Sequence, residues 1–379
     1  MKPTKLLFLV NPAWFFESHR LPIALAAQKA GYEVHLALPD DPVTGAVTNA
    51  GFKIHIVSMT RQEASIQSEL RTFWEIYKLY KKVKPDIVHH VTIKPVLYGS
   101  IIARLLRVSA VVNAFSGLGH VFIASGWKAA CRRSIVCFGY RRAFKHKNCT
   151  CIIQNLDDQN VLQSYKVLKN DQSVLIKGSG VNLKKYEVVP EPKGKPIVTL
   201  ASRLIAEKGI VEFIQAARRI NNAHFVLVGD VDKGNPSALK EKTIRRWEKE
   251  GVIEWKGFSD NINETFKKSS IVVLPSYREG LPKVLIEALA CGRPIVTTNT
   301  AGCRDMVNPE NPNGILVPIR NYELLADAIQ KLIDDKELRT AMGEASREWA
   351  EQNFSIEKVI EDTLNVYKNI AIQKNTINS

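Results

Sequence analysis

Short apolar segments alternate with longer amphipathic stretches along almost the whole chain of 379 residues. Strands that are apolar throughout are buried on both faces of a sheet, and helices between them allow neighbouring strands to run parallel. The pattern therefore predicts an α/β protein built from doubly wound parallel sheets. Strands are expected at 6–10, 34–38, 54–57, 87–89, 111–112, 151–154 and 174–176, and again at 197–201, 225–228, 253–255, 271–274, 295–297 and 315–317.

A Pro- and Lys-rich stretch at 188–196 separates the two sets of strands and has no apolar periodicity. Two domains also agree with the length of the chain, since a domain usually has roughly 150 residues. We therefore expect a first domain at 1–187 and a second at 188–355. Ligands of open α/β sheets bind at the carboxyl ends of the strands, so the turns after the strands are where chemistry is expected.

Composition excludes several classes of protein. A chain with 45% hydrophobic and 24% charged residues is neither disordered nor collagen-like. It has no run of 18 apolar residues and no signal-peptide pattern at its start, so we expect no membrane-spanning helix. The six cysteines form no Cys-x-x-Cys pair and no zinc-binding spacing, which predicts reduced cytosolic thiols and no metal site.

Positive charge is concentrated in the first half of the chain. Residues 1–175 contain 23 basic and 11 acidic residues, whereas the remainder contains 30 and 27. The first half is therefore expected to meet an anionic partner, either nucleic acid, an acidic membrane surface or a phosphorylated ligand. General solubility explains the same charge, and charge alone does not choose among these.

The turn after strand 197–201 carries two cations, Arg203 and Lys208, just before a helix that begins near Ile210. Cations beside the free N–H groups of a helix N-terminus form an anion site suited to a diphosphate. The alternative interpretation is that both side chains are solvated on a loop.

The segment from 271 to 292 is predicted to be a strand, a turn and a helix, and it carries two carboxylates. Glu279 lies in the turn, where it is able to meet sugar hydroxyls. Glu287 lies in the helix with apolar neighbours, where a carboxylate is costly unless hydrogen-bond donors reach it. A vicinal diol, such as a nucleotide ribose, supplies two donors, and a buried ion pair with a local Arg or Lys is the alternative.

These motifs resemble the retaining glycosyltransferase family 4, because Arg203, Lys208-Gly209, Glu279-Gly280-x-Pro282, Glu287 and Gly292-x-Pro294 appear in order at the family's separations. The resemblance covers essentially the whole chain. It implies the GT-B fold, two Rossmann-like domains facing a cleft, with a C-terminal helix in 356–379 that crosses back to the first domain.

The resemblance also implies a role for each motif in the second domain. Arg203 and Lys208 would hold the donor diphosphate, Glu287 the ribose and Glu279 the donor sugar. The backbone of Gly280, Leu281, Pro282 and Lys283 would lie against the diphosphate or sugar, and Gly257 near the base. The donor substrate is expected to be a UDP-sugar, with no separate cofactor and no metal.

The turn at 301–305 departs from the family's commoner Gly-Gly-x-x-Glu pattern. It is similar to a subgroup that adds an N-acetylhexosamine to a polyprenyl-diphosphate-linked saccharide during assembly of bacterial surface glycans such as O-antigen, capsule or N-glycan. The segments 88–95 and 116–122 indicate the same subgroup.

In the first domain, candidate acceptor-binding residues follow two strands. His19 and Arg20 face the acceptor phosphate in one interpretation and simply start a helix in the other. Many family members place a histidine or acidic residue just before the first glycine of the second turn, and here Ser116 stands in that place, before Gly117. His120 follows four residues after Ser116. Retention in this fold is usually explained by the leaving phosphate taking the acceptor proton, so His120 is expected to orient donor or acceptor and not to act as a base; a structural role is the alternative.

Residues 125–150 contain seven cations and no acid, interleaved with aromatic residues. Such a segment suits anionic headgroups, and it also suits nucleic acid through phosphates and stacking. Because no nucleic-acid-binding signature is present, we favour the membrane surface, with a solvated face as the bland alternative. The cations expected at the membrane are Lys128, Arg132, Arg133, Arg141, Arg142 and Lys145.

The sequence thus predicts a cytoplasmic glycosyltransferase, peripherally associated with the inner face of the membrane. Its partners would be a nucleotide-sugar donor, a lipid-linked saccharide acceptor and an anionic membrane surface, and not nucleic acid. Two alternatives remain at this point, a transferase with a soluble acceptor and a non-catalytic protein that binds through its basic surface.

Overall fold

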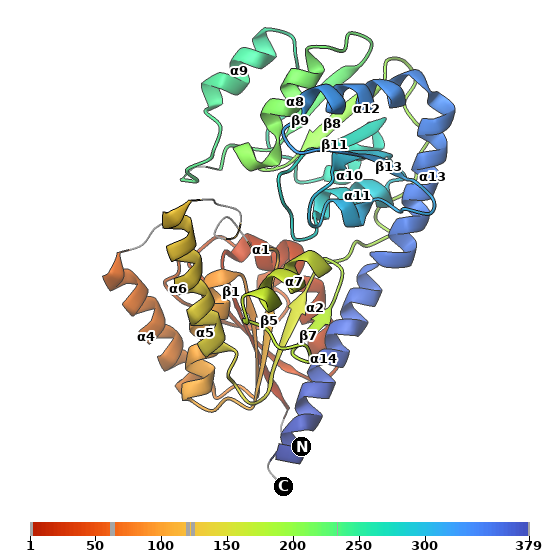
Figure 1. Ribbon diagram of the computed structural model, residues 1–379. Helices are drawn as coiled ribbons and strands as arrows, with labels where there is room; N and C mark the ends of the chain where they lie inside the picture. Colours follow the sequence, from red (N-terminus) through yellow and green to blue (C-terminus); the bar gives the residue numbers. More distant parts are fainter. Residues whose placement is uncertain (1–2, 61–64, 119–121, 123–125, 233, 378–379) are drawn as a thin grey trace. The chain divides into compact units, whose positions relative to one another are not determined.

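The computed structural model describes residues 3–60, 65–118, 122, 126–232 and 234–377, with side chains as far as residue 372. The chain divides into two compact units (Figure 1). Unit 1 comprises Met1–Ser179 and Glu357–Ser379, and unit 2 comprises Gly180–Ile356. Each unit contains one parallel sheet with helices on both faces, which confirms the predicted α/β class with two doubly wound sheets.

Unit 1 is built on a seven-stranded sheet in the order β3-β2-β1-β4-β5-β6-β7. The order reverses at β1, where Leu6 pairs with Val34 of β2 on one side and Ile87 of β4 on the other. The strands are β1 Lys5–Val10, β2 Glu33–Leu38, β3 Lys53–Ile56, β4 Ile87–Val91, β5 Ala110–Ala114, β6 Cys149–Ile153 and β7 Ser173–Leu175.

Alternation along β1 divides the core of unit 1 between two layers. Leu7 and Leu9 pack on the face covered by α4 Ile66–Val83, α5 Ile93–Leu105 and α6 Trp127–Ala143. Phe8 lies on the opposite face, which is covered by α1, α2, α3 and α14. Those helices are α1 Ala13–His19, α2 Leu21–Lys29, α3 Gly45–Thr48 and α14 Ile356–Ile377, and α7 Leu156–Ser164 follows β6.

Unit 2 contains a six-stranded sheet in the order β10-β9-β8-β11-β12-β13. The strands are β8 Ile197–Ala201, β9 His224–Val228, β10 Glu254–Trp255, β11 Ile271–Leu274, β12 Ile295–Thr298 and β13 Gly314–Val317. The helical segments are η2 Ala206–Lys208, α8 Ile210–Ala217, α9 Glu241–Lys249, α10 Ile262–Lys267, α11 Lys283–Ala290, η3 Arg304–Met306, α12 Tyr322–Asp334 and α13 Lys336–Asn353.

Each of the thirteen expected strand segments coincides with a strand of the structure, in one of the two sheets. The largest difference in length concerns 111–112, which forms part of a five-residue strand, β5. The end of this strand was not predicted, because the polar Asn113 interrupts the apolar run on which the prediction was based. Asn113 is fully buried, and its side-chain oxygen bonds to His90.

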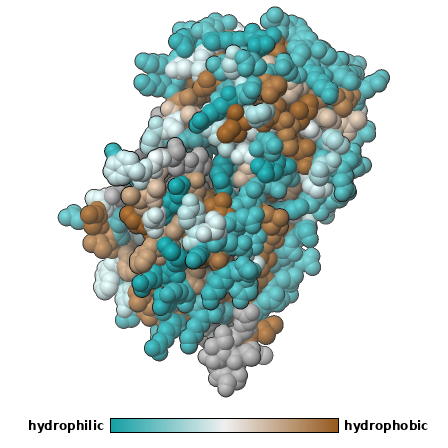
Figure 2. Space-filling view, in the orientation of Figure 1, coloured by the Kyte–Doolittle hydropathy of each residue, from teal (hydrophilic) through white to brown (hydrophobic). Residues whose placement is uncertain are grey.

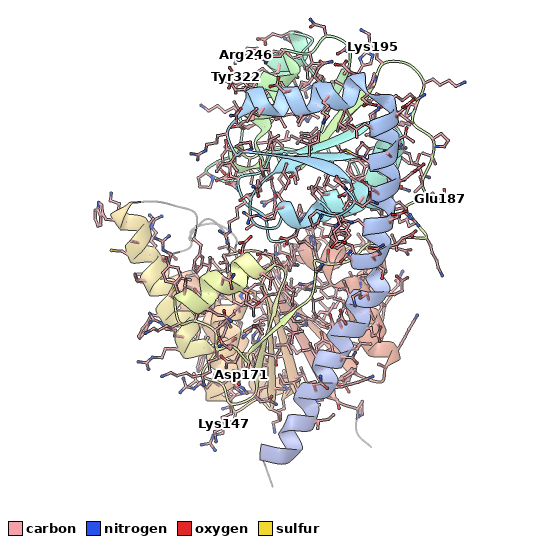
Figure 3. All side chains as sticks on the ribbon, turned by 45° about the vertical axis from the view of Figure 1, so that its right-hand side comes forward. Lys147, Asp171, Glu187, Lys195, Arg246 and Tyr322 are labelled. Atoms are coloured by element: carbon pink, nitrogen blue, oxygen red, sulfur yellow. The ribbon has the colours of Figure 1, made fainter. Side chains whose placement is uncertain are left out.

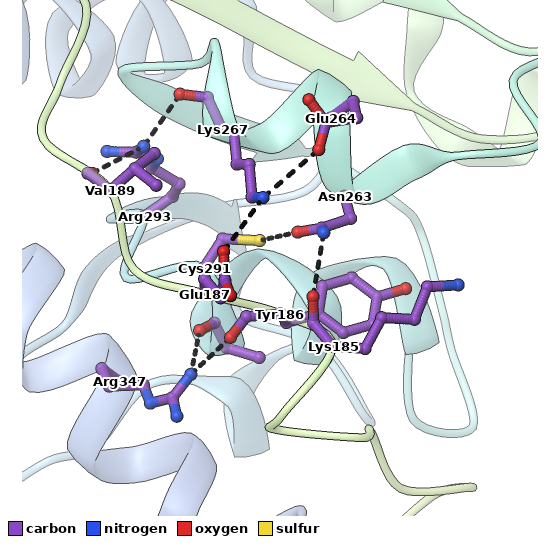
Figure 4. A network of polar contacts seen from close by, with 11 residues as sticks. Lys185, Tyr186, Glu187, Val189, Asn263, Glu264, Lys267, Cys291, Arg293 and Arg347 are labelled. Atoms are coloured by element: carbon purple, nitrogen blue, oxygen red, sulfur yellow. Dashed lines mark hydrogen bonds and ion pairs between the residues drawn. The ribbon is translucent and has the colours of Figure 1, made fainter.

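The boundary expected at 187 is displaced, because residues 180–187 belong to unit 2. Side chains from two helices of unit 2, α10 and α13, hold the backbone of this segment (Figure 4). Asn263 donates to the Lys185 carbonyl at 2.9 Å, and Arg347 donates to the Tyr186 carbonyl at 2.6 Å. No local pattern predicts these bonds, since their donors lie about 80 and 160 residues further along the chain.

The Pro- and Lys-rich stretch at 188–196 also lies on unit 2, and its ends, near Glu187 and Lys195, project outward (Figure 3). Arg293 donates to the Val189 carbonyl at 3.0 Å. The chain instead passes between units at Ser179 and at Ile356, and α14 packs into the core of unit 1 through residues such as Tyr367.

Candidate active site

A cation and a carboxylate from separate strand ends meet in unit 2. Lys208 is the last residue of η2, and its Nζ lies 2.5 Å from Oε1 of Glu279, 71 residues away. Gly209, the residue after Lys208, has φ of 69°, and a Cβ there would lie 2.1 Å from the Pro275 carbonyl oxygen. Glycine therefore lets the Lys208 turn approach the end of β11, where Glu279 follows.

Arg203 also lies at the carboxyl end of β8, with its own carboxylate partner. Its Nη1 is 2.6 Å from Oδ2 of Asp232, and the arginine side chain is 42% exposed. The sequence pattern predicted that Arg203 and Lys208 form one anion site together. In the structure each is instead engaged by a different acidic residue, so an arriving diphosphate would compete with, or share, both ion pairs.

The turn that carries Glu279 rests on the turn after β12. The Glu279 N–H donates to the Ala301 carbonyl at 3.1 Å. Gly302 has φ of 74°, and a Cβ there would lie 2.4 Å from the Gly280 carbonyl oxygen. The 301–305 segment, which departs from the family's commoner pattern, thus contributes a close backbone support to the candidate sugar-binding turn.

The same segment leads directly into the helix that carries the second carboxylate. Leu281 is buried, and Pro282 is the N-cap of α11. Lys283 is the first residue of the helix. Gly280 and these three residues therefore lie together between the two carboxylates in the chain.

Glu287 lies on α11 and is only 8% exposed. Tyr186 donates its hydroxyl to Oε1 at 2.7 Å, and Lys283 lies one helical turn away with its Nζ 3.6 Å from the same oxygen. The local cation of the alternative interpretation is therefore present, at the long end of ion-pair range. Burial, with the nearby Glu287 carboxylate, raises the pKa of Tyr186, so its hydroxyl remains a proton donor.

A hollow of about 430 Å³ lies at the carboxyl ends of β9 and β10. Gly257 lines it, has φ of 66° and accepts a 2.7 Å bond from the Gly229 N–H. Trp255 donates its ring N–H to the Gly229 carbonyl at 2.8 Å. A second hollow of about 450 Å³ lies at the amino ends of the same strands and contains none of the predicted site residues.

The sequence analysis did not predict a cluster of side chains that holds Tyr277, in the turn after β11, in place. The Tyr277 hydroxyl donates to Glu212 Oε1 at 2.7 Å, and the Arg320 guanidinium lies 4.8 Å from the Tyr277 ring. Burial, followed by Glu212, raises the pKa of Tyr277 to about 12. Tyr186 was missed for the same reason, because a partner about 65 or 100 residues away leaves no periodic signal.

The predicted residues of unit 1 have differing environments. Arg20 is buried, donates to the His19 carbonyl at 3.2 Å, and has a pKa lowered to about 10 by burial. His19 stacks on Phe15, with ring centroids 3.9 Å apart. The helix-start alternative therefore fits Arg20, which is the N-cap of α2.

Ser116 and Gly117 follow β5, and the Ser116 hydroxyl is buried with no hydrogen-bond partner among the described residues. Gly117 has φ of 101°, a value that favours glycine. His120 lies outside the described residues, so the structure adds nothing on its expected role.

The basic segment forms α6 and the loop after it. Five of its six predicted membrane-facing cations, Lys128, Arg132, Arg141, Arg142 and Lys145, are exposed, and Arg133 is half-buried. Over the part of the chain that is described, no helix has the length and apolar character needed to cross a bilayer. Within the same residues, no group of three or more His, Cys, Asp or Glu side chains is arranged to hold a metal ion.

Two family models match successive parts of the chain. The model described as "Glycosyl transferases group 1" matches residues 183–349, which include the candidate site of unit 2. The model described as "Glycosyl transferase 4-like" matches residues 5–154 of unit 1. The chain therefore belongs to this family of two-domain glycosyltransferases.

Two relatives extend over most of the chain. It is 28% identical over 334 residues to the N,N'-diacetylbacillosaminyl-diphospho-undecaprenol alpha-1,3-N-acetylgalactosaminyltransferase of Campylobacter jejuni. The aligned region covers 84% of this chain and 87% of that protein. It is 25% identical over 328 residues to the UDP-Gal:alpha-D-GlcNAc-diphosphoundecaprenol alpha-1,3-galactosyltransferase of Escherichia coli, over 82% of each chain.

Solved structures share the fold over nearly the full length. Sucrose-phosphate synthase from Thermosynechococcus elongatus superposes with a TM-score of 0.81 at 20% identity, covering 97% of this chain and 99% of that one. Anabaena HepE in complex with UDP and glucose superposes with a TM-score of 0.77 at 19% identity, covering 96% and 99%. The chain is thus a GT-B glycosyltransferase.

Proposed function

We propose that this protein transfers an N-acetylhexosamine from a UDP-sugar to a polyprenyl-diphosphate-linked saccharide, with retention of the anomeric configuration. The observation that carries the donor site is Glu287, a nearly buried carboxylate fixed by Tyr186 in the helix that follows the Glu279 turn. A fixed, partly desolvated carboxylate suits the two hydroxyls of a ribose. The lipid-linked acceptor is supported by the names of the two relatives above, both of which specify a sugar linked to a polyprenyl diphosphate.

In this proposal the cations act on the leaving group. The bond between the sugar carbon and the diphosphate oxygen breaks as the acceptor hydroxyl forms the new glycosidic bond, and its proton passes to the departing phosphate oxygen. Negative charge grows on the diphosphate, where Arg203 and Lys208 stabilise it. Asp232 and Glu279 hold the two cations before the donor arrives, and Glu279 then meets the sugar hydroxyls.

Unit 1 supplies the acceptor side in this proposal. Ser116 and Gly117, which follow β5, and His120, close to them in the sequence, contact the acceptor, and the exposed cations of α6 bind the anionic headgroups of the inner leaflet. The protein would then work at the cytoplasmic face of the membrane without a spanning helix. Neither a metal ion nor nucleic acid has a part in this scheme.

The donor assignment is tested by thermal unfolding of the purified chain with UDP, GDP, ADP or CMP. A specific ligand at 100 times its dissociation constant adds about 2.7 kcal/mol to the free energy of unfolding. UDP is expected to stabilise the wild type and not Glu287→Ala. Glu191→Ala is the control, because it also removes a carboxylate that is bonded to a side chain of unit 2, Arg339, and the UDP response of this variant should persist.

A stabilisation by UDP that survives in Glu287→Ala would contradict the ribose assignment. No response to any nucleotide would overturn the proposed function and favour the binding-protein alternative. The acceptor is tested by incubating UDP-N-acetylhexosamine with a polyprenyl-diphosphate disaccharide or the free disaccharide, in the presence and absence of EDTA. Transfer to the free sugar alone would move the soluble-acceptor alternative to first place.

A further inference from the structure

The outward face of α4 carries a row of apolar side chains that no other part of the described chain covers. Ile66, Leu70 and Trp74 recur every four residues and are between 55% and 80% exposed. The opposite side of the helix packs into the core of unit 1. Glu69 fixes this rotation, because it accepts bonds from Lys94 at 2.6 Å and Tyr98 at 2.7 Å, both on α5.

Helix α6 has a second such row of exposed apolar side chains, whose position on one face was not predicted from the sequence. Trp127, Ile135 and Phe138 are between 55% and 75% exposed, and Cys131 is exposed between them. Their spacing of four, four and three residues places them on one face of a helix. Tyr140, on the other side, is buried in the core.

The two rows belong to the same layer of unit 1. Helix α5 packs against both α4 and α6, and all three cover the same face of the sheet (Figure 1). Figure 2 shows brown, apolar surface interrupted by teal on the side of the molecule where these helices lie. Exposed apolar surface gathered in this way marks an interaction site and not a set of scattered residues.

Cations lie directly beside the aromatic members of both rows. On α4, Lys78 Nζ lies 5.5 Å from the centre of the Trp74 ring. On α6, Lys128 Nζ lies 5.5 Å from the centre of the Trp127 ring, and the Arg142 guanidinium lies 5.0 Å from that of Phe138. An apolar strip bordered by cations and interfacial tryptophans is the pattern of a helix lying in the surface of an anionic bilayer.

We propose that α4 and α6 together form one membrane-docking face, in which the two apolar rows enter the acyl boundary of an anionic bilayer while the flanking cations bind its phosphates. This inference rests on the proposed function for its biological sense. It gives α4, for which the sequence predicted no role at the membrane, an equal part in docking.

Charge decides between a bilayer and the other occupants of such a face. A second copy of the chain would set the cations of α6 against each other, and residues 125–150 contain no acid to neutralise them. Nucleic acid would use the phosphate-binding cations and stack on the tryptophans, but Ile66, Leu70 and Ile135 would then gain nothing. Only a surface that is anionic outside and apolar beneath uses both sets of side chains.

The experiment is co-sedimentation of the full chain with vesicles of phosphatidylglycerol and phosphatidylethanolamine, compared with phosphatidylcholine alone. Leu70→Ser is expected to weaken binding to the anionic vesicles about tenfold, because one leucine is lost from the buried row. Leu156→Ser is the matched control, since Leu156 is 57% exposed on α7 of the same unit and lies on neither row. Its binding should equal that of the wild type.

Salt separates the two components of the face. Arg141→Gln with Arg142→Gln should weaken binding at low salt and much less at high salt, whereas the loss in Leu70→Ser should persist. Cys131 offers a direct probe, because the other five cysteines are buried and an environment-sensitive dye would label it selectively. Anionic vesicles should shift the dye emission to the blue.

Three outcomes would overturn the proposal: equal losses in Leu70→Ser and Leu156→Ser, a concentration-dependent dimer abolished by Leu70→Ser without vesicle binding, or single-stranded RNA that competes fully with the vesicles. UDP stabilisation, measured on the same variants, keeps the two proposals apart. A protein that binds vesicles without responding to UDP loses the proposed function and keeps the docking face, and the reverse result removes only the docking face.

Discussion

The two units place their polar groups in opposite ways. In unit 2 the charged residues of interest lie in turns at the strand ends, where Lys208 meets Glu279 and Arg203 meets Asp232. In unit 1 titratable groups lie inside the sheet itself, where His89 and His90 are fully buried in β4. Unit 2 therefore carries these charges in ion pairs at the strand-end turns, whereas unit 1 uses much of its polar chemistry inside its own core.

The interior of unit 1 satisfies His90 from both sides of its ring. Tyr80 lies 2.8 Å from Nε2, and Asn113 lies 2.8 Å from Nδ1. Gly99 makes room for the ring, since a Cβ there would lie 2.5 Å from it. The neighbouring His89 bonds to Tyr367 of α14 through Nδ1, so this network also anchors the last helix.

The largest effect is expected from the charges of unit 2. Lys208→Ala and Arg203→Ala should each lower kcat/KM for sugar transfer about 100-fold or more, because the charge that grows on the diphosphate loses a stabilising cation. Arg218→Ala is the control, since Arg218 is paired with Glu250 at 2.6 Å and is 47% exposed, much like Arg203. Comparable losses in all three variants would show that surface ion pairs, and not the site, set the rate.

Acid should separate the stabilities of the two units. Burial, with a smaller contribution from His146, lowers the pKa of His90 to about 4, although its bond to Asn113 raises it. The unfolded chain then binds more protons than the folded one below the ordinary value of 6.5. The stability that His90 contributes is therefore complete above pH 6.5 and is lost as the pH falls towards 4, by an amount on the order of 3 kcal/mol.

Hydrogen exchange at pH 7 and pH 5, followed by mass spectrometry, measures this difference. Burial lowers the pKa of His89 well below its usual range, in the same direction as for His90. Peptides of β4 and β5 should lose protection at pH 5, and peptides of β8 and β11 should lose less, because unit 2 has a single histidine, the exposed His224. Equal losses of protection in both units would refute the comparison.

An intermediate effect is expected where α14 joins unit 1. Tyr367→Phe removes the hydroxyl next to His89 Nδ1, and the other ring nitrogen of His89 already lacks a hydrogen-bond partner among the described residues. Leaving a buried polar atom unsatisfied costs about 1–3 kcal/mol. Chemical denaturation monitored in unit 1 should show that loss, whereas Tyr165→Phe, at a more exposed position, should show little.

The smallest effect concerns the support of the Glu279 turn. Tyr277→Phe leaves Glu212 without its tyrosine partner, and Glu212 Oε2 has no partner among the described residues. We expect KM for the donor to rise several-fold with little change in kcat, since the turn is loosened and the cations remain. The double change Tyr277→Phe and Glu212→Leu should recover part of the loss, because neither partner is then left unsatisfied. A fall in kcat alone would assign Tyr277 to the chemical step.

Several features were predictable because their signals are local. The apolar runs marked every strand, and the turn motifs placed Lys208 and Glu279 after strand ends of unit 2 and Glu287 in the helix that follows the second of these turns. The cations of α6 were visible as composition. Its aromatic residues were visible too, but the cations all around the helix obscured the one face that Trp127, Ile135 and Phe138 share.

The α/β class, the two sheets and the residues at the carboxyl ends of their strands were predictable from the amino-acid order alone, because apolar runs and turn residues act over a few positions. The folded chain was needed to reveal that Tyr186 bonds to Glu287, that residues 180–187 belong to unit 2 and that Arg20 is buried. Each of these depends on partners far apart in the chain, and packing alone brings such partners together.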